Sequence, residues 1–183
     1  METSFCGLPL LTLPGQVMTP RPATEQLVAT ATARIGDRPA RVADVGTGSG
    51  AIAVSLALAA PSAEIWASDV SASAVLLARA NAHRFGVADR VYAERGDLLD
   101  PLPGGLDLIV ANLPYLPRGE ERPELAGEPE QAVYANGDGL GLYRRLLEAA
   151  SEKLRHDGAV MIQLHRKVFL FERAQIAGLP AVA

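Results

Sequence analysis

A glycine-rich loop carries the first candidate chemistry of the sequence. Residues 44–50 read Asp-Val-Gly-Thr-Gly-Ser-Gly, where a short β-prone run passes into a strongly apolar helical stretch. Gly46 and Gly48 permit a tight turn and leave no Cβ in the way of a ligand, and Gly50 lets the helix pack close to the strand. A nicotinamide site shows G-x-G-x-x-G and holds a pyrophosphate, whereas this loop is G-x-G-x-G preceded by an acid. The spacing disfavours dinucleotide binding and leaves a purely structural turn as the other interpretation.

Two acids follow the next two strands. Asp69 ends the second strand 19 positions after the last loop glycine, close to the roughly 20-residue offset at which a carboxylate accepts from ribose hydroxyls. Its alternative role is to interact with the dipole of the helix that starts near Ser71. Asp97 and Leu98 follow the third strand, where they could reach an adenine amine and ring face. Asp97 is equally well placed as a turn residue.

A third cluster, Asn112-Leu113-Pro114-Tyr115, ends the fourth strand. It lies at the carboxyl edge of the sheet, where open α/β folds bind ligands. An Asn side-chain oxygen and a backbone carbonyl directed at one point accept both hydrogens of an NH2 group, and an aromatic ring stacks on a flat substrate. Such a site would orient a planar amide or exocyclic amine by alignment and preorganised acceptors rather than by a strong base. A strand-ending turn with a packed tyrosine is the other interpretation.

Alternating strands and helices position these residues. Strands are predicted over 41–45, 64–68, 90–94, 106–111 and 159–164, and helices over 22–35, 49–60, 71–85, 142–154 and 167–177. Residues 1–20, which hold three prolines, should form an extended segment packed on the domain, and residues 113–139 a long polar loop. This order predicts an α/β fold with a doubly wound, mainly parallel sheet.

The composition narrows the class of protein. The 183 residues carry a formal charge of −4, which argues against holding nucleic acid mainly through its phosphates and favours a protein or small-molecule substrate. Cys6 is the one cysteine, and the three histidines lack metal-ligand spacing, so we expect no disulfide and no metal site. No apolar run approaches the roughly 18 residues of a membrane helix. We therefore expect one cytoplasmic domain over residues 1–183, with no membrane partner.

Taken together, the motifs resemble those of protein-(glutamine-N5) methyltransferases of the HemK/PrmC type. They are DVGTGSG at 44–50, the acid at Asp69, Gly96-Asp97, NLPY at 112–115 and PRPATE at 20–25. Residues 128–147, EPEQAVYANGDGLGLYRRLL, are similar to the family's EP-x-x-A-L followed by G-x-D-G-L. The resemblance covers residues 20 to about 164.

The resemblance implies a Rossmann-like fold of the class I methyltransferase type and S-adenosylmethionine (SAM) as cofactor. It further implies that the acceptor is the glutamine side chain in the Gly-Gly-Gln motif of a peptide chain release factor. The implied cofactor-binding residues are Gly46, Thr47, Gly48, Ser49 and Gly50 for the methionine part, Asp69 for the ribose, Asp97 and Leu98 for the adenine, and Asn112. Asn112 and the Leu113 carbonyl would hold the substrate amide. Asn112, Pro114 and Tyr115 would be catalytic, with Pro114 and Tyr115 also shaping the substrate pocket.

The sequence departs from the family pattern in three ways. Leu113 replaces the usual proline of N-P-P-Y but still supplies a carbonyl, so we expect activity to survive. Ala23 replaces the usual glutamate of PRPETE, which removes any polar contact from that position. The family's helical N-terminal domain and the final strand pair of its sheet are not expected in these 183 residues. Two other functions therefore remain: an amino-methyltransferase acting on adenine in DNA or RNA, and a SAM-binding scaffold that has lost catalysis.

Overall fold

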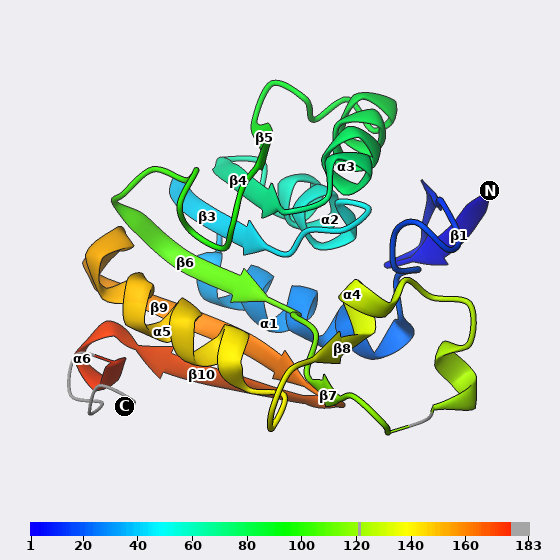
Figure 1. Ribbon diagram of the computed structural model, residues 1–183. Coiled ribbons are helices and arrows are strands. Elements are labelled where there is room, and N and C mark those ends of the chain that lie inside the picture. The colour runs from blue at the N-terminus through cyan, green and yellow to red at the C-terminus, as the bar shows by residue number, and fades with distance from the viewer. Residues whose placement is uncertain (121, 177–183) are drawn as a thin grey trace.

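A six-stranded sheet forms the centre of the molecule (Figure 1). The structure, a computed structural model, describes residues 1–120 and 122–176. The strands lie in the order β10-β9-β6-β3-β4-β5, and every neighbouring pair is parallel except β10 with β9. Their bounds are β3 (Ala40–Val45), β4 (Ala63–Asp69), β5 (Val91–Arg95), β6 (Leu106–Ala111), β9 (Leu154–Leu164) and β10 (Lys167–Glu172). The expected doubly wound, mainly parallel α/β fold is confirmed.

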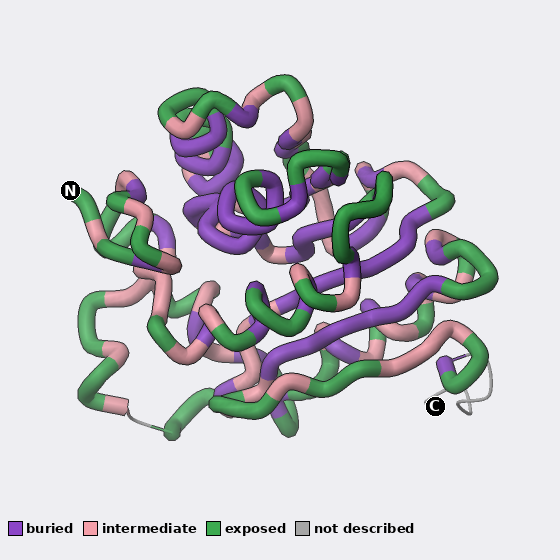
Figure 2. Tube along the Cα trace, turned by 180° about the vertical axis from the view of Figure 1, so that it is seen from behind, coloured by how far each residue is buried: buried purple, intermediate pink, exposed green. Residues whose placement is uncertain are grey.

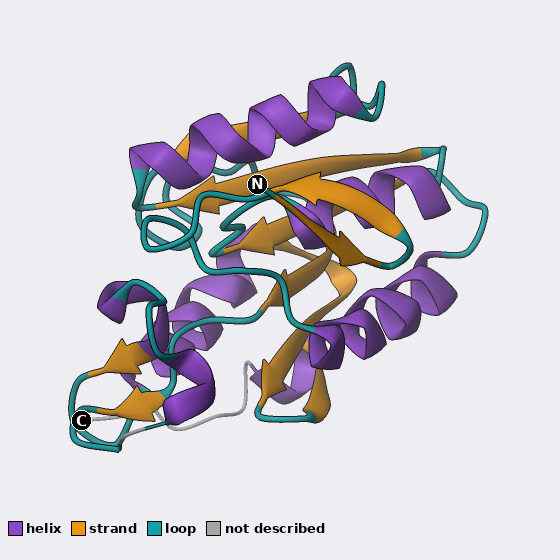
Figure 3. Cartoon of the chain, turned by 90° about the vertical axis from the view of Figure 1, so that its right-hand side faces the viewer, coloured by secondary structure: helices purple, strands orange, loops and turns teal. Residues whose placement is uncertain are grey.

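Helices cover both faces of this sheet (Figure 3). They are α1 (Glu25–Ile35), preceded by the 3-10 turn η1 (Pro22–Thr24), then α2 (Ala51–Ala59), α3 (Ala72–Arg84), α5 (Gly141–Lys153) and α6 (Arg173–Ile176). Neighbouring residues of a strand point to opposite faces, so Val42 belongs to the apolar layer that contains α1, α2 and α3, and Ala43 to the layer that contains α5 and α6. The sheet is thus buried between two apolar layers, as the purple strands of Figure 2 show. Among the described residues, no helix is long and apolar enough to cross a membrane.

Two segments extend this framework. The antiparallel strands β1 (Glu2–Phe5) and β2 (Leu8–Leu11) form a hairpin in the N-terminal segment. The long stretch 113–139 contains β7 (Leu116–Pro117), η2 (Pro123–Leu125), α4 (Glu130–Val133) and β8 (Tyr134–Ala135). Both segments lie at the carboxyl-end side of the sheet, to the right in Figure 1.

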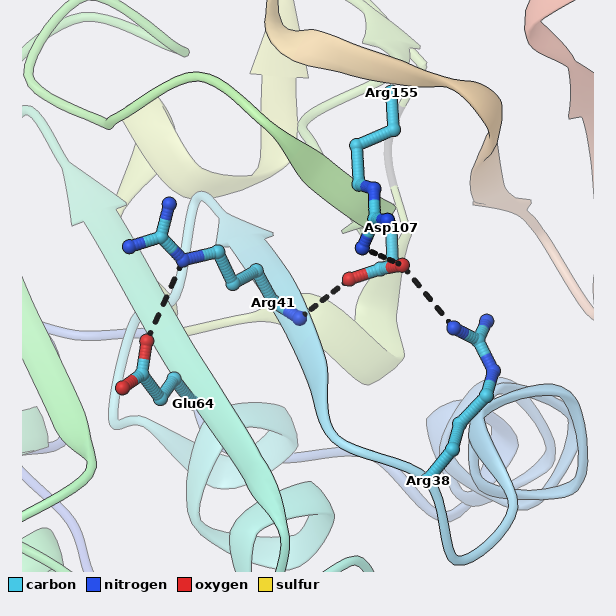
Figure 4. A network of polar contacts seen from close by, with 5 residues as sticks. All are labelled: Arg38, Arg41, Glu64, Asp107 and Arg155. Carbon is cyan, nitrogen blue, oxygen red and sulfur yellow. Dashed lines mark hydrogen bonds and ion pairs between the residues drawn. The ribbon is translucent and has the colours of Figure 1, made fainter.

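One buried carboxylate connects the strands at their amino ends (Figure 4). Asp107, 4% exposed, accepts from Nη1 of Arg38 and Nη1 of Arg155, each at 3.1 Å. It also accepts from the Arg41 backbone N–H at 2.8 Å, and the Arg41 side chain pairs with Glu64. Asp107 therefore joins β3, β6 and β9 at the edge opposite the candidate site.

The expected helix over residues 167–177 is wrong for residues 167–172, which form β10. Val168 packs on one apolar layer and Phe171 on the other, so this segment alternates as a strand does. The same two residues are three apart, a spacing that also suits one face of a helix. Only residues 173–176 are helical, and residue 177 lies outside the described residues. The expectation that the final strand pair is missing is wrong in part, because one antiparallel strand, β10, lies beside β9.

Candidate active site

Asp44 anchors the turn between β3 and α2. Its carboxylate is fully buried, and Oδ2 accepts from the Thr47 hydroxyl at 2.6 Å and from the Ala53 N–H at 3.1 Å. Burial raises the pKa of Asp44 to about 7 although both donors act in the opposite direction. The second oxygen, Oδ1, is buried and has no hydrogen-bond partner within the described residues. Asp44 therefore fixes the conformation of the loop through these hydrogen bonds, and it lines neither of the two cavities described below.

Two of the three loop glycines are required by close contacts, Gly46 with the Leu113 side chain and Gly50 with α3. All three have positive φ, at 74° for Gly46, 56° for Gly48 and 77° for Gly50. A Cβ at Gly46 would lie 2.7 Å from Cδ2 of Leu113, and one at Gly50 would lie 2.9 Å from Cα of Ala78. The close approach at Gly50 is therefore to α3 and not, as expected, to the strand. The turn geometry predicted for the loop is present.

Asp69 joins the glycine loop to the start of α3. Its Oδ2 accepts from the Gly48 N–H and its Oδ1 from the Ser71 N–H, each at 2.9 Å. Ser71 caps α3 by accepting from the Ala74 N–H. Burial raises the pKa of Asp69. The helix-terminus role considered for Asp69 is thus present, and its side chain also faces a pocket.

That pocket, of about 150 Å³, lies at the carboxyl ends of the parallel strands. The predicted cofactor residues that line it are Gly46, Gly48, Asp69, Asp97, Leu98 and Asn112. The other three point elsewhere: the Thr47 hydroxyl binds Asp44, the Ser49 carbonyl accepts from Asn81, and Gly50 packs on α3. Part of the wall comes from residues 16–18, which no motif marked, and from residues 131–132, which lie in the stretch 128–147 that resembles the family.

Asp97 and Leu98 are both held by neighbours. Arg145 Nη2 donates to Asp97 Oδ2 at 2.6 Å between partly exposed side chains, which leaves Oδ1 for another donor. Leu98 adopts a positive φ of 45°, and its carbonyl accepts from the Ser68 hydroxyl at 2.6 Å. A non-glycine residue with positive φ is uncommon and marks a conformation imposed by its surroundings.

A larger cleft of about 1210 Å³ adjoins this pocket. Residues 112–114 line both cavities, together with Met18 and Ala132. Tyr115 lines only the larger cleft, and its ring meets the His165 imidazole edge-on with centroids 4.7 Å apart. Three of the four residues predicted to bind a substrate amide, Asn112, Leu113 and Pro114, therefore form the junction between the two cavities, and Tyr115 lines the larger cleft beside it.

Two buried hydroxyl groups contact this junction, and neither was predicted as a site residue although both lie in stretches that resemble the family. Asn112 Nδ2 donates to Thr24 Oγ1 at 3.0 Å. The Leu113 N–H donates to the Tyr143 hydroxyl at 2.9 Å, and that hydroxyl lies 3.0 Å from the Leu113 carbonyl and 2.8 Å from the Gln163 carbonyl. Thr24 is part of the PRPATE motif, but its partner lies 88 residues away.

Comparison with known proteins agrees with this arrangement. The family profile described as methyltransferase small domain matches residues 21–128. The chain is 42% identical over 159 residues to the release factor glutamine methyltransferase of Deinococcus radiodurans and 43% identical over 153 residues to that of Bordetella pertussis. These matches cover 84% and 80% of this chain but 56% of each relative. The chain thus spans little more than half the length of these relatives, and the expected resemblance to the HemK/PrmC-type family is confirmed.

Solved structures show the same fold. A ribosomal protein L11 methylase from Lactobacillus delbrueckii is 27% identical with a TM-score of 0.59, covering 81% of this chain and 63% of the other. A 16S rRNA methyltransferase from T. thermophilus, solved with AdoMet and guanosine, is 20% identical with a TM-score of 0.64 and covers 88% of this chain and 40% of the other, a likeness of fold alone. With the profile spanning residues 21–128, the chain belongs to the methyltransferase small domain family.

Proposed function

We propose that the chain is a SAM-dependent methyltransferase that acts on a side-chain amide nitrogen, specifically the glutamine of the Gly-Gly-Gln motif of a peptide chain release factor. The observation that carries the proposal is the position of Asn112 and Leu113 at the junction of two cavities. Methyl transfer requires donor and acceptor to meet at one point in line. A wall shared by a cofactor pocket and a substrate cleft provides such a point.

The smaller pocket fits the parts of SAM in this proposal. Gly46 and Gly48 present backbone without Cβ atoms, so a ligand can approach the loop closely. Asp69 uses one lone pair of each oxygen on a backbone N–H and retains others for two ribose hydroxyls. Asp97 and Leu98 would take the adenine, and Asn112 would border the methyl group. When bound, the cofactor supplies an electrophilic methyl group on a sulfonium centre.

The larger cleft would hold the acceptor. Asn112 Oδ1 and the Leu113 carbonyl accept the two hydrogens of the substrate amide and so fix the plane of its nitrogen. Pro114 and Tyr115 shape the wall behind it, since both line this cleft. As the nitrogen gains the methyl group it loses one of these two hydrogens as a proton, which would pass to water, and the donor sulfur becomes a neutral thioether. Because both hydrogens already point at acceptors, the chemistry relies on preorganised dipoles rather than on a strong base.

We also propose that residues 1–183 form a single methyltransferase domain on which the N-terminal segment packs, and that the chain acts in the cytoplasm. Support for the first point comes from contacts between β2 and α3. The Leu11 N–H donates to Asn81 Oδ1 at 2.8 Å, and Asn81 Nδ2 donates to the Leu11 and Ser49 carbonyls. One buried amide thereby links the hairpin, α3 and the glycine loop.

A methyl-transfer assay tests the proposed function. Tritiated SAM is offered with release factor, tRNA, rRNA and DNA, and we expect label on the release factor. Asn112→Ala should lower that transfer by about two orders of magnitude, the scale seen when a positioned polar group is removed. Cofactor affinity, measured by calorimetry, should barely change. Label confined to nucleic acid would favour the adenine amino-methyltransferase, and cofactor binding without any transfer would favour the scaffold.

A further inference from the structure

We propose that two buried hydroxyl groups, Thr24 Oγ1 and Tyr143 OH, orient the two acceptors that hold the substrate NH2 group. The inference rests on the proposed function, because the acceptors are the Asn112 side chain and the Leu113 carbonyl. Thr24 ends η1 ahead of α1, and Tyr143 lies in α5 on the other face of the sheet. Each is a positioning residue that acts through its neighbour.

Thr24 anchors the Asn112 amide through its nitrogen, which leaves the oxygen available to the cleft. The two ends differ chemically, since Nδ2 only donates and Oδ1 only accepts. Nδ2 is bound to Thr24 Oγ1 at 3.0 Å, while Oδ1 has no hydrogen-bond partner within residues 1–120 and 122–176. With the amide reversed, its NH2 would meet the NH2 of the substrate, donor against donor. Thr24 is 5% exposed, so water does not readily replace it as the partner.

Tyr143 fixes the backbone carbonyl. Its hydroxyl carries one hydrogen but lies within hydrogen-bond distance of two carbonyls, those of Gln163 at 2.8 Å and Leu113 at 3.0 Å. It also accepts from the Leu113 N–H at 2.9 Å. A single hydrogen cannot satisfy both carbonyls fully, so the Leu113 carbonyl keeps accepting capacity while its peptide is held in place. Burial raises the pKa of the Tyr143 phenol, which keeps this hydrogen in place at ordinary pH.

Variants of similar shape separate positioning from packing. Thr24→Val and Tyr143→Phe remove each hydroxyl and keep the bulk of the side chain, and Thr24→Ser restores the hydroxyl at residue 24. Ala150→Gly is the matched control, because residue 150 is buried in α5 like Tyr143 but lines neither cavity. Steady-state transfer to release factor gives kcat and KM, calorimetry gives SAM affinity, and thermal melting gives stability.

We expect Thr24→Val and Tyr143→Phe each to lower kcat by about tenfold or more, as misoriented groups do. SAM affinity should stay within about twofold, and Thr24→Ser should return kcat to within about threefold of the parent. Ala150→Gly should lower the melting temperature and leave kcat unchanged. Parent-like kcat in Thr24→Val and Tyr143→Phe, or no recovery in Thr24→Ser, would overturn the proposal.

A spectroscopic readout separates this proposal from the proposed function. The side-chain NH2 signals of Asn112 in a nuclear magnetic resonance spectrum should shift in Thr24→Val and return in Thr24→Ser, whatever the acceptor is. If the parent chain methylates another amine instead of release factor, the same variants are measured with that amine. Unchanged Asn112 signals in Thr24→Val overturn the Thr24 orientation even when release factor is methylated, and a parent that methylates nothing overturns both proposals.

Discussion

Asp44 places a carboxyl group where water does not reach, and its ionisation should therefore depend on folding. Its pKa is about 7 in the folded chain against 3.8 ordinarily. Below about pH 4 the Asp44 carboxyl holds its proton in both the folded and the unfolded chain. As the pH rises the unfolded chain loses this proton first. The stability contributed by the neutral carboxyl is therefore lost as the pH rises through about 7.

This argument predicts the behaviour of Asp44→Asn, which keeps the shape and cannot ionise. We expect the free energy of unfolding of the parent minus that of the variant to fall steadily between pH 4 and pH 7. Urea denaturation at several pH values measures both. A difference that stays constant over this range would mean that Asp44 has its ordinary pKa in the folded chain.

Leu113 departs from the family's usual proline, and the structure shows what the exchange would alter. Leu113→Pro removes the N–H that donates to the Tyr143 hydroxyl but keeps the carbonyl. We expect methyl transfer within a fewfold of the parent and a loss of stability of about 1 kcal/mol from the missing buried hydrogen bond. Transfer rates and melting curves check both. A loss of activity as large as that of Asn112→Ala would assign the essential contact to the N–H.

At the scale of elements, the glycine loop makes two separable contributions. Gly50 and Gly48 both have positive φ, but only a Cβ at Gly50 would press on α3, 2.9 Å from Ala78 Cα. A Cβ at Gly48 would lie 3.7 Å from Val17 Cγ1, an ordinary contact, and Gly48 lines the smaller pocket.

We therefore expect Gly50→Ala to be the less stable variant. Both substitutions strain the backbone, and overpacking adds roughly 1–3 kcal/mol at residue 50 alone. Gly48→Ala should instead weaken SAM binding, and it should lower the melting temperature less than Gly50→Ala does. Melting curves with and without SAM give both quantities, and equal stability of the two variants would show that α3 moves aside freely.

The central strands could be predicted from the sequence because their apolar runs are buried on both faces. Residues 106–111 were predicted with the bounds of β6, and Ser71 caps α3 as expected. The strand β10 was missed because its apolar spacing suits either structure, and its pairing with β9 decides between them. The roles of Thr24 and Tyr143 could not be found from the sequence. Both residues lie in stretches that resemble the family, at 20–25 and 128–147, but their partners are set by contacts across the fold.

Segments far apart in the chain enclose the two cavities. Residues 16–18 and 131–132 both line the smaller pocket. The chain next to each of these stretches is joined by Glu128, whose Oε2 accepts from the Thr19 N–H and whose Oε1 pairs with Arg21 Nη2, each at 3.0 Å. The Glu128 side chain is 10% exposed and that of Arg21 is 34% exposed. The ion pair is thus partly shielded from solvent, so removing one partner should lower stability.

The same stretch supplies a matched exposed pair, Arg118 with Glu130 at 3.2 Å, whose side chains are 60% and 76% exposed. Glu128→Gln should weaken the attachment of residues 122–135 by about 1–3 kcal/mol, because Thr19 and Arg21 then share one neutral acceptor. Glu130→Gln should change it little, since exposed pairs contribute about 0–1 kcal/mol.

Hydrogen exchange of residues 122–135 measures the attachment, and calorimetry measures SAM affinity. We expect faster exchange and weaker SAM binding in Glu128→Gln alone, because the pocket wall at 131–132 depends on this contact. Equal exchange in both variants would mean that other contacts hold the stretch, and faster exchange with unchanged affinity would remove residues 131–132 from the cofactor site.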